Sequence, residues 1–203
     1  MKKLISLFLL LSCSAIADDN EIYVDQVGAT ANIDLEQLGS GNIIGGLNSV
    51  SGTMTPFDLD GTSMNLDLNQ IGNNNKMLGD INADTFTGIF DFDGDSNQYT
   101  IQVDPTNTYS ADSSNVNVDV DGSSNTFTLD LATNALASGA DVDTIVQGSS
   151  NTINIDLDID SATNYMDIDG DSNTINYDGD GYASGYFKLD HTGSSRSFDI
   201  EQQ

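Results

Sequence analysis

Apolar and polar residues alternate with a period of two along most of this chain. In segments such as 116–120 and 127–131, Val, Phe or Leu occupies every second position, and Asp, Thr or Asn lies between. This alternation over five to seven residues is typical of a strand with one buried face. No helical period competes with it after the first segment. The pattern therefore predicts an all-β protein.

Glycines divide the alternating segments at regular intervals. Several spacings equal eleven residues or a multiple of eleven, and two wider gaps contain 105–114 and 132–140, which we predict to be inserted loops. The aligned glycines are Gly28, Gly39, Gly61, Gly72, Gly94, Gly122, Gly148, Gly170 and Gly193. Three residues after most of them comes an asparagine: Asn42, Asn75, Asn97, Asn125, Asn151 and Asn173.

The repeating unit is therefore a strand, a glycine-containing turn and a second strand, about 22 residues in all. Glycine reaches backbone conformations that cost other residues energy, and small polar neighbours such as Ser123 and Ser124 suit the same turn. Short units that cannot bury an apolar face alone favour a stacked array. We predict a single β-solenoid of strand–turn–strand repeats.

Neutral amides occupy positions that share the inward face with the apolar rows. Asparagine lies three residues after the glycine, and Gln26, Gln37 and Gln70 lie two residues before one. In a stack, an amide can donate to the copy above and accept from the copy below, at a spacing of about 4.8 Å. Aspartate could not, because like charges would be buried unpaired. Aspartate instead occupies the alternate, outward positions.

The chain is strongly acidic, with 32 Asp and Glu residues against 5 Lys and Arg, and a net charge of −27. Such a surface repels phosphates, so nucleic acids and anionic lipid heads are excluded as direct partners. Stacked outward carboxylates about 5 Å apart repel by just under roughly 1 kcal/mol per pair in water. One buried Ile or Phe contributes roughly 1.5–3 kcal/mol, so burial outweighs the repulsion.

The segment 1–17 is a predicted signal peptide. Lys2 and Lys3 precede a short apolar run, and Ala15-Ile16-Ala17 is a small-residue cleavage site. We expect a secreted protein whose repeat domain covers 18–203, with three cationic side chains left (3 − 32 = −29). The alternative is a lipoprotein with Cys13 lipidated. The domain ends in mid-strand without a cap, so either this end polymerises or the product is longer.

Two segments contain the full pattern Gln-x-Gly-x-x-Asn, from Gln37 to Asn42 and from Gln70 to Asn75. This pattern resembles the repeat of the curlins, the subunits of bacterial curli fibres. The resemblance implies a stack of strand–turn–strand units that self-associates outside the cell. The rhythm is also similar to that of curlin-like secreted proteins of marine phages and bacteria, which implies an exported product. From Gly94 onward, apolar residues such as Phe92 and Val120 replace the inner glutamine.

Candidate chemistry is sparse. If the acidic turns bind calcium, the first candidates are Asp93, Asp95, Asp169, Asp171, Asp178 and Asp180, but the glutamate of a typical calcium loop does not follow them. A solvated acidic face is the favoured interpretation, and we expect no other cofactor. His191 is the sole histidine, at an inward position, so it is predicted to pack rather than to catalyse. Nothing in this inventory predicts an enzyme.

Two functions follow from these observations. The first is an extracellular fibre or matrix subunit that acts mainly by self-association. The alternative is a monomeric β-solenoid binding module, such as an adhesin, an ice-binding protein or a virion-surface fibre, with a surface or glycan as its ligand. The threonine row Thr126, Thr152 and Thr174 motivates the ice-binding variant, although threonine is also a common exposed strand residue.

Overall fold

The computed structural model describes residues 21–39, 42–47, 53–104, 111–132, 137–180 and 185–202. The predicted signal peptide and Cys13 lie outside these residues. The described residues form strands, turns and connections without a helix. The protein is therefore all-β, as the alternation predicts.

The strands pair almost entirely in parallel, and only β5 and β6 form an antiparallel pair. Their bounds are β1 Glu21–Ile22, β2 Asp25–Val27, β3 Thr30–Leu38, β4 Ile43–Ile44, β5 Gly46–Leu47, β6 Met54–Thr55, β7 Phe57–Ile71, β8 Lys76–Asp93, β9 Gln98–Val103, β10 Asn115–Asp121, β11 Thr126–Leu131, β12 Ala137–Ser138, β13 Asp141–Gln147, β14 Thr152–Asp160, β15 Thr163–Asp169, β16 Thr174–Asp180, β17 Tyr186–Thr192 and β18 Ser197–Gln202.

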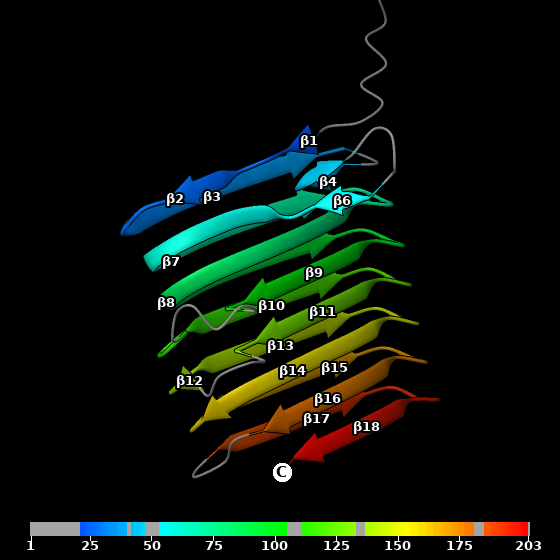
Figure 1. The fold of residues 1–203 in the computed structure, drawn as a ribbon. Helices are drawn as coiled ribbons and strands as arrows, with labels where there is room; N and C mark the ends of the chain where they lie inside the picture. Colours follow the sequence, from blue (N-terminus) through cyan, green and yellow to red (C-terminus); the bar gives the residue numbers. More distant parts are fainter. Residues whose placement is uncertain are drawn as a thin grey trace, which may run out of the picture.

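The strands stack in two columns, and the chain crosses between the columns at both edges of each level (Figure 1). The entry column leads into the glycine turns and contains β3, residues 63–71 of β7, residues 85–93 of β8, and β10, β13, β15 and β17. The exit column leaves these turns and contains β1 with β2, β4 with residues 57–61 of β7, residues 76–81 of β8, and β9, β11, β14, β16 and β18. This solenoid-like stacking leaves the same two outer faces on every level.

The register keeps equivalent residues above one another in every level. Thr152 lies beside Thr174, and Lys76 lies beside Gln98, so that each of these residues pairs with the corresponding residue of the next level. Wider offsets occur where residues are inserted at the edge opposite the glycine turns, as between β9 and β10. Residues 105–110 and 133–136 of the two predicted loops lie outside the described residues. The insertions therefore lengthen one bend without disturbing the stack.

The core lies between the two columns and runs the length of the stack. Inward rows of Phe, Leu, Ile and Val are fully buried; for example, Phe127, Leu129 and Leu131 have no exposed surface. The Phe92 and Tyr99 rings, from opposite columns, stack with centroids 3.7 Å apart. Apolar rows from both columns thus share one continuous core.

Two of the aligned glycines lie at a different edge from the others. Gly28 follows β2 and Gly61 lies in the middle of β7, and both are at the bend between the exit and entry columns. The interval of eleven residues therefore separates the bend at one edge of a level from the glycine turn at the other edge. A complete level returns after about two such intervals, except where residues are inserted.

Candidate functional site

The glycine turns form one edge of the stack. At Gly72, Gly94, Gly122, Gly148 and Gly170 the backbone φ lies between 128° and 144°. Two residues later the φ is 63°, at Asn74 and at the equivalent serines. A Cβ added to Gly148 would lie 1.9 Å from the carbonyl oxygen of Gly122. Only glycine fits here, because both the φ angle and the close approach of the next turn exclude a side chain.

The asparagines after the turns form a buried ladder. Asn125 Oδ1 accepts the backbone N–H of Asn97 at 2.8 Å, and its Nδ2 donates to the carbonyl oxygen of Gly94 at 2.8 Å. Asn151 repeats both bonds, to Asn125 and to Gly122. The amides were expected to bond to one another. Instead, each bonds to the backbone of the preceding turn and satisfies polar groups there.

Two glutamine side chains bond directly to each other between the two segments in which the motif is complete. Gln70 Nε2 donates to Gln37 Oε1 at 2.9 Å, and both side chains are buried. Gln26 lies in the other column, in register with Leu59. This difference follows from the position of Gly28 at the opposite bend.

A second ladder lies in the same turns, one residue after the glycine, and sequence inspection missed it. Asp95 Oδ1 accepts the backbone N–H of Ser123 at 2.6 Å, and Asp171 Oδ1 accepts that of Ser194 at 2.6 Å. The bonds from Ser194 hold the pKa of Asp171 below its usual value. The only sequence signal was that Asn, Asp or Ser recurs at this position. Two calcium candidates thus already serve as hydrogen-bond acceptors for neighbouring turns.

The other calcium candidates are dispersed. Asp93 and Asp169 are exposed at the ends of entry strands, whereas Asp178 and Asp180 lie on the outer face of β16. Among the described residues, no group of three or more His, Cys, Asp or Glu side chains is arranged to hold a metal ion. The six residues therefore do not form one common site.

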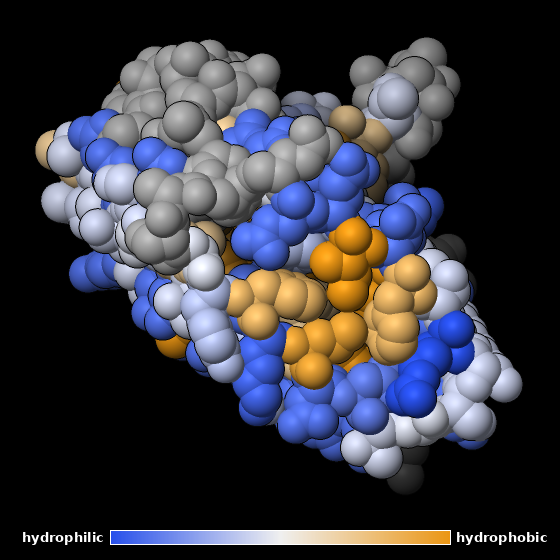
Figure 2. All heavy atoms as spheres, turned by 90° about the horizontal axis from the view of Figure 1, so that it is seen from below, coloured by the Kyte–Doolittle hydropathy of each residue, from blue (hydrophilic) through white to orange (hydrophobic). Residues whose placement is uncertain are grey.

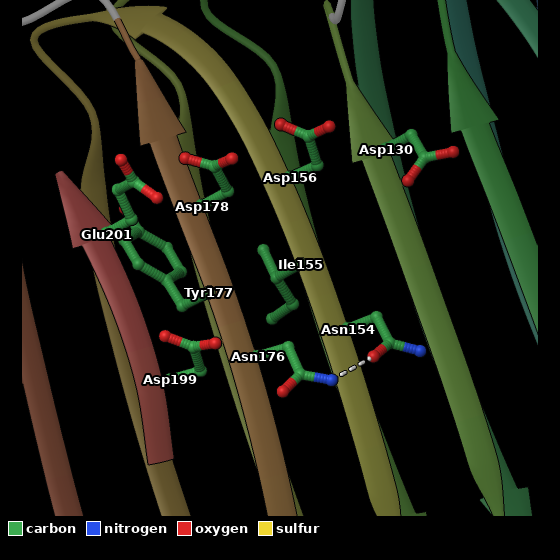
Figure 3. A pocket seen from close by; sticks show the side chains of 9 residues that line it. All are labelled: Asp130, Asn154, Ile155, Asp156, Asn176, Tyr177, Asp178, Asp199 and Glu201. Carbon is green, nitrogen blue, oxygen red and sulfur yellow. Dashed lines mark hydrogen bonds between the residues drawn. The ribbon is translucent and has the colours of Figure 1, made fainter. Parts of the chain in front are cut away.

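A column of carboxylates follows the outer face of the exit column. The carboxylates in register are Asp25, Asp58, Asp80, Asp130, Asp156, Asp178 and Glu201, and the neutral Gln102 lies between Asp80 and Asp130. Figure 3 shows the last four carboxylates of this acidic column side by side. They line a groove of about 360 Å3. Asn154 and Asn176 line the same groove, where Asn176 Nδ2 donates to Asn154 Oδ1 at 2.8 Å. The outer face is thus acidic along the stack and carries amides beside the groove.

Burial and mutual repulsion shift the titration of this column. Partial burial, followed by the neighbouring charges of Asp158, Asp130, Asp178 and Asp180, raises the pKa of Asp156 to about 6. Burial also raises the pKa of Asp58, Asp80 and Asp130. Several carboxyl groups of this column therefore bind a proton at a higher pH than isolated carboxyl groups do.

His191 faces inward from β17, as its position in the repeat predicts. Its ring meets the Phe198 ring edge-on at 5.4 Å, and its Nδ1 lies 2.8 Å from Arg196 Nη1. The side chain is half-buried. These neighbours are packing partners on the last level of the stack.

The last level leaves inward side chains uncovered. Ile175 and Tyr177 of β16 are 0% and 5% exposed, whereas Phe198 and Ile200, in register with them on β18, are 38% and 44% exposed. In Figure 2, which looks at this end of the stack, apolar surface gathers in the middle and polar surface surrounds it. Within the described residues, β17 pairs only with β15 and β18 only with β16. This end presents both an apolar surface and two open strand edges.

No family model, curated protein or solved structure matches this chain. Among the described residues, no helix is long and apolar enough to cross a membrane.

Proposed function

We propose that this chain is an exported, non-enzymatic structural subunit that self-associates through the ends of its stack into fibres or a matrix. In this proposal the fold is a curlin-like β-solenoid, and each level is one strand–turn–strand repeat. Export rests on the predicted signal peptide, 1–17. The protein acts as a building block, and its repeated residues have structural roles.

The observation that carries the proposal is the uncovered last level. Phe198 and Ile200 continue columns that are buried throughout the rest of the stack. An open strand edge beside an apolar surface is a template for another chain. The two ends of a stack differ, so their contact is heterologous. Because they lie at opposite ends of one stacking axis, repeated contacts continue along that axis and generate filaments. Burial of each such side chain contributes roughly 1.5–3 kcal/mol to the contact.

The experiment follows the sedimentation and thioflavin fluorescence of the purified polypeptide 18–203 over a range of concentrations and salt. We expect concentration-dependent fibres with a strand spacing of about 4.8 Å along the fibre axis. The double variant Phe198→Ser, Ile200→Ser should remain folded, because these side chains are already exposed, and should assemble at least tenfold more slowly. Ser197→Ala, on the outer face of the same strand, is the matched control. A persistent monomer at every concentration contradicts the proposal.

The groove on β14 and β16 favours a second candidate, a monomeric β-solenoid binding module. Its amides at Asn154 and Asn176 offer donors and acceptors beside carboxylates, a combination that suits a polar ligand such as a glycan. A persistent monomer that binds glycans, and loses binding in Asn176→Ala, would support this candidate over the first.

A further inference from the structure

The first and last strands of the exit column carry the same inward pattern. Ile22 occupies the same inward row as Phe198, because the register connects them through Ile44, Met77, Tyr99, Phe127, Ile153 and Ile175. Gln26 shares a row with Gln202, through Leu59, Ile81, Val103, Leu131, Leu157 and Gly179. Between them, Val24 corresponds to Ile200. In both strands, two apolar residues and a glutamine occupy the inward rows.

Because both strands belong to the exit column, two copies that meet end to end would place two exit strands in succession at the joint. Along the chain, a strand of the entry column always lies between two successive strands of the exit column. Both β18 and residues 22–27 belong to the exit column. If residues 22–27 of a second copy lay directly on β18, the entry column would lack one strand at the joint. The edge of β17 would then have no neighbour, and Phe187 and Leu189 would stay uncovered.

We propose that, when copies associate, β18 of one copy replaces residues 22–27 of the next copy. This inference rests on the proposed self-association and specifies its joint. Ser197–Gln202 would then lie on Ile43–Ile44 and Phe57–Leu59 of the next copy, where residues 21–26 lie in the single chain. The alternation of columns continues across the joint without a gap.

The replacement brings β3 of the next copy onto the open edge of β17. The inward rows then match, because Leu35 continues the row of Leu189 and Ile33 continues the row of Phe187. The outer row places Asp34 of the next copy beside Lys188. Lys188 is about half exposed and lies 3.8 Å from Asp190. In a chain with few cations, this pair of opposite charges favours the head-to-tail orientation.

The segment that leaves is the weaker of the two strands. In the exit column, residues 22–27 pair in two short pieces, β1 and β2, of two and three residues. β18 is an unbroken strand of six residues that pairs with β16 along its length. On Ile43–Ile44 and Phe57–Leu59, β18 can form the backbone hydrogen bonds that residues 22–27 give up, and Phe198 buries more apolar area than Ile22.

Disulfide crosslinking tests the joint, and the polypeptide 18–203 contains no cysteine to interfere. Cα atoms of paired strands lie within the range that a disulfide bridges. In the proposed joint, Glu201 neighbours Asp58 of the next copy, since β18 takes the position of Asp25. We therefore expect Glu201→Cys with Asp58→Cys to give a ladder of crosslinked oligomers, and Lys188→Cys with Asp34→Cys to do the same. Each single-cysteine variant is the control.

Two outcomes would overturn the replacement while self-association stands. One is crosslinking of Glu201→Cys with Asp25→Cys in place of Asp58→Cys. The other is normal assembly of Asp25→Cys, Asp58→Cys after oxidation of the monomer, because that disulfide holds residues 22–27 in place and should block assembly until it is reduced. Sedimentation of the unmodified polypeptide reports separately on the proposed function. If no variant and no unmodified chain sediments, both proposals fail together.

Discussion

Asn125 and Asn97 are joined by a buried hydrogen bond between levels: Asn125 Oδ1 accepts the backbone N–H of Asn97 at 2.8 Å. The same side chain donates to Gly94, in the turn just before Asn97. One amide thus satisfies a donor and an acceptor of the neighbouring level. This double role requires a neutral side chain that both accepts and donates.

Asn125→Asp should destabilise the protein by about 2–4 kcal/mol, because it removes the bond to Gly94 and buries a charge beside a carbonyl oxygen. Denaturant unfolding monitored by circular dichroism measures this change. Asn117→Asp, on the exposed outer face, adds the same charge and should cost less than about 1 kcal/mol. Equal effects of the two substitutions would show that the ladder does not support the stack.

Gly148→Ala should cost at least about 2 kcal/mol, since the φ of 128° and the Gly122 carbonyl oxygen both conflict with a Cβ. Gly28→Ala is the matched control, because its Cβ would make only an ordinary contact of 3.4 Å with Gln26. There the change should be near neutral. Thermal melting of the two variants compares them, and an intact melting temperature for Gly148→Ala would contradict the turn geometry.

Added salt should raise the melting temperature, because counter-ions screen the in-register carboxylates from Asp58 to Glu201. Divalent cations should act at lower concentrations than monovalent ones. The measurement is a melting curve at several concentrations of sodium and magnesium chloride at constant pH. A melting temperature that is the same at low and high salt would argue against net repulsion in the acidic column.

Mild acidification should also stabilise the fold. The folded pKa of Asp156 is raised to about 6 from an ordinary value of 3.8, so the folded chain binds its proton more tightly than the unfolded chain. That stabilisation is fully present below 3.8 and is lost as the pH rises through 6. Asp171 acts in the opposite sense, because its lowered pKa adds stability that is lost at strongly acidic pH.

We therefore expect a higher melting temperature near pH 5 than near pH 7, at constant ionic strength. Asp156→Asn should reduce this difference, because it removes a carboxyl group whose pKa is raised to about 6, within this pH range. Asp190→Asn, on the exposed last level, should leave the difference unchanged. A melting temperature that falls steadily from pH 7 to pH 5 would show that repulsion between carboxylates does not dominate the dependence of stability on pH.

Much of the fold could be predicted from local patterns. Alternation identified Phe127 and Leu129 as inward and Asp130 as outward, because successive side chains of a strand point to opposite faces whatever its neighbours are. The same parity placed Asn125 inside. His191 was likewise placed facing inward.

The turns were predicted less completely. The sequence suggested that Gly28 and Gly39 are equivalent, yet they lie at opposite edges, because the spacing of eleven residues counts both bends of one level. The hydrogen bonds of Asp95 were missed as well, since a polar residue in a turn does not reveal whether a neighbouring turn lies within reach.

By itself, the sequence determined the strands, their inward faces and the neutral amides among them, because these depend on a period of two and on the cost of burying charge. Only the tertiary structure decided which strands are neighbours, since parallel stacking and antiparallel pairing share the same alternation. It therefore also decided that the carboxylates from Asp25 to Glu201 form one column, and that Phe198 and Ile200 lie uncovered at the end of the core.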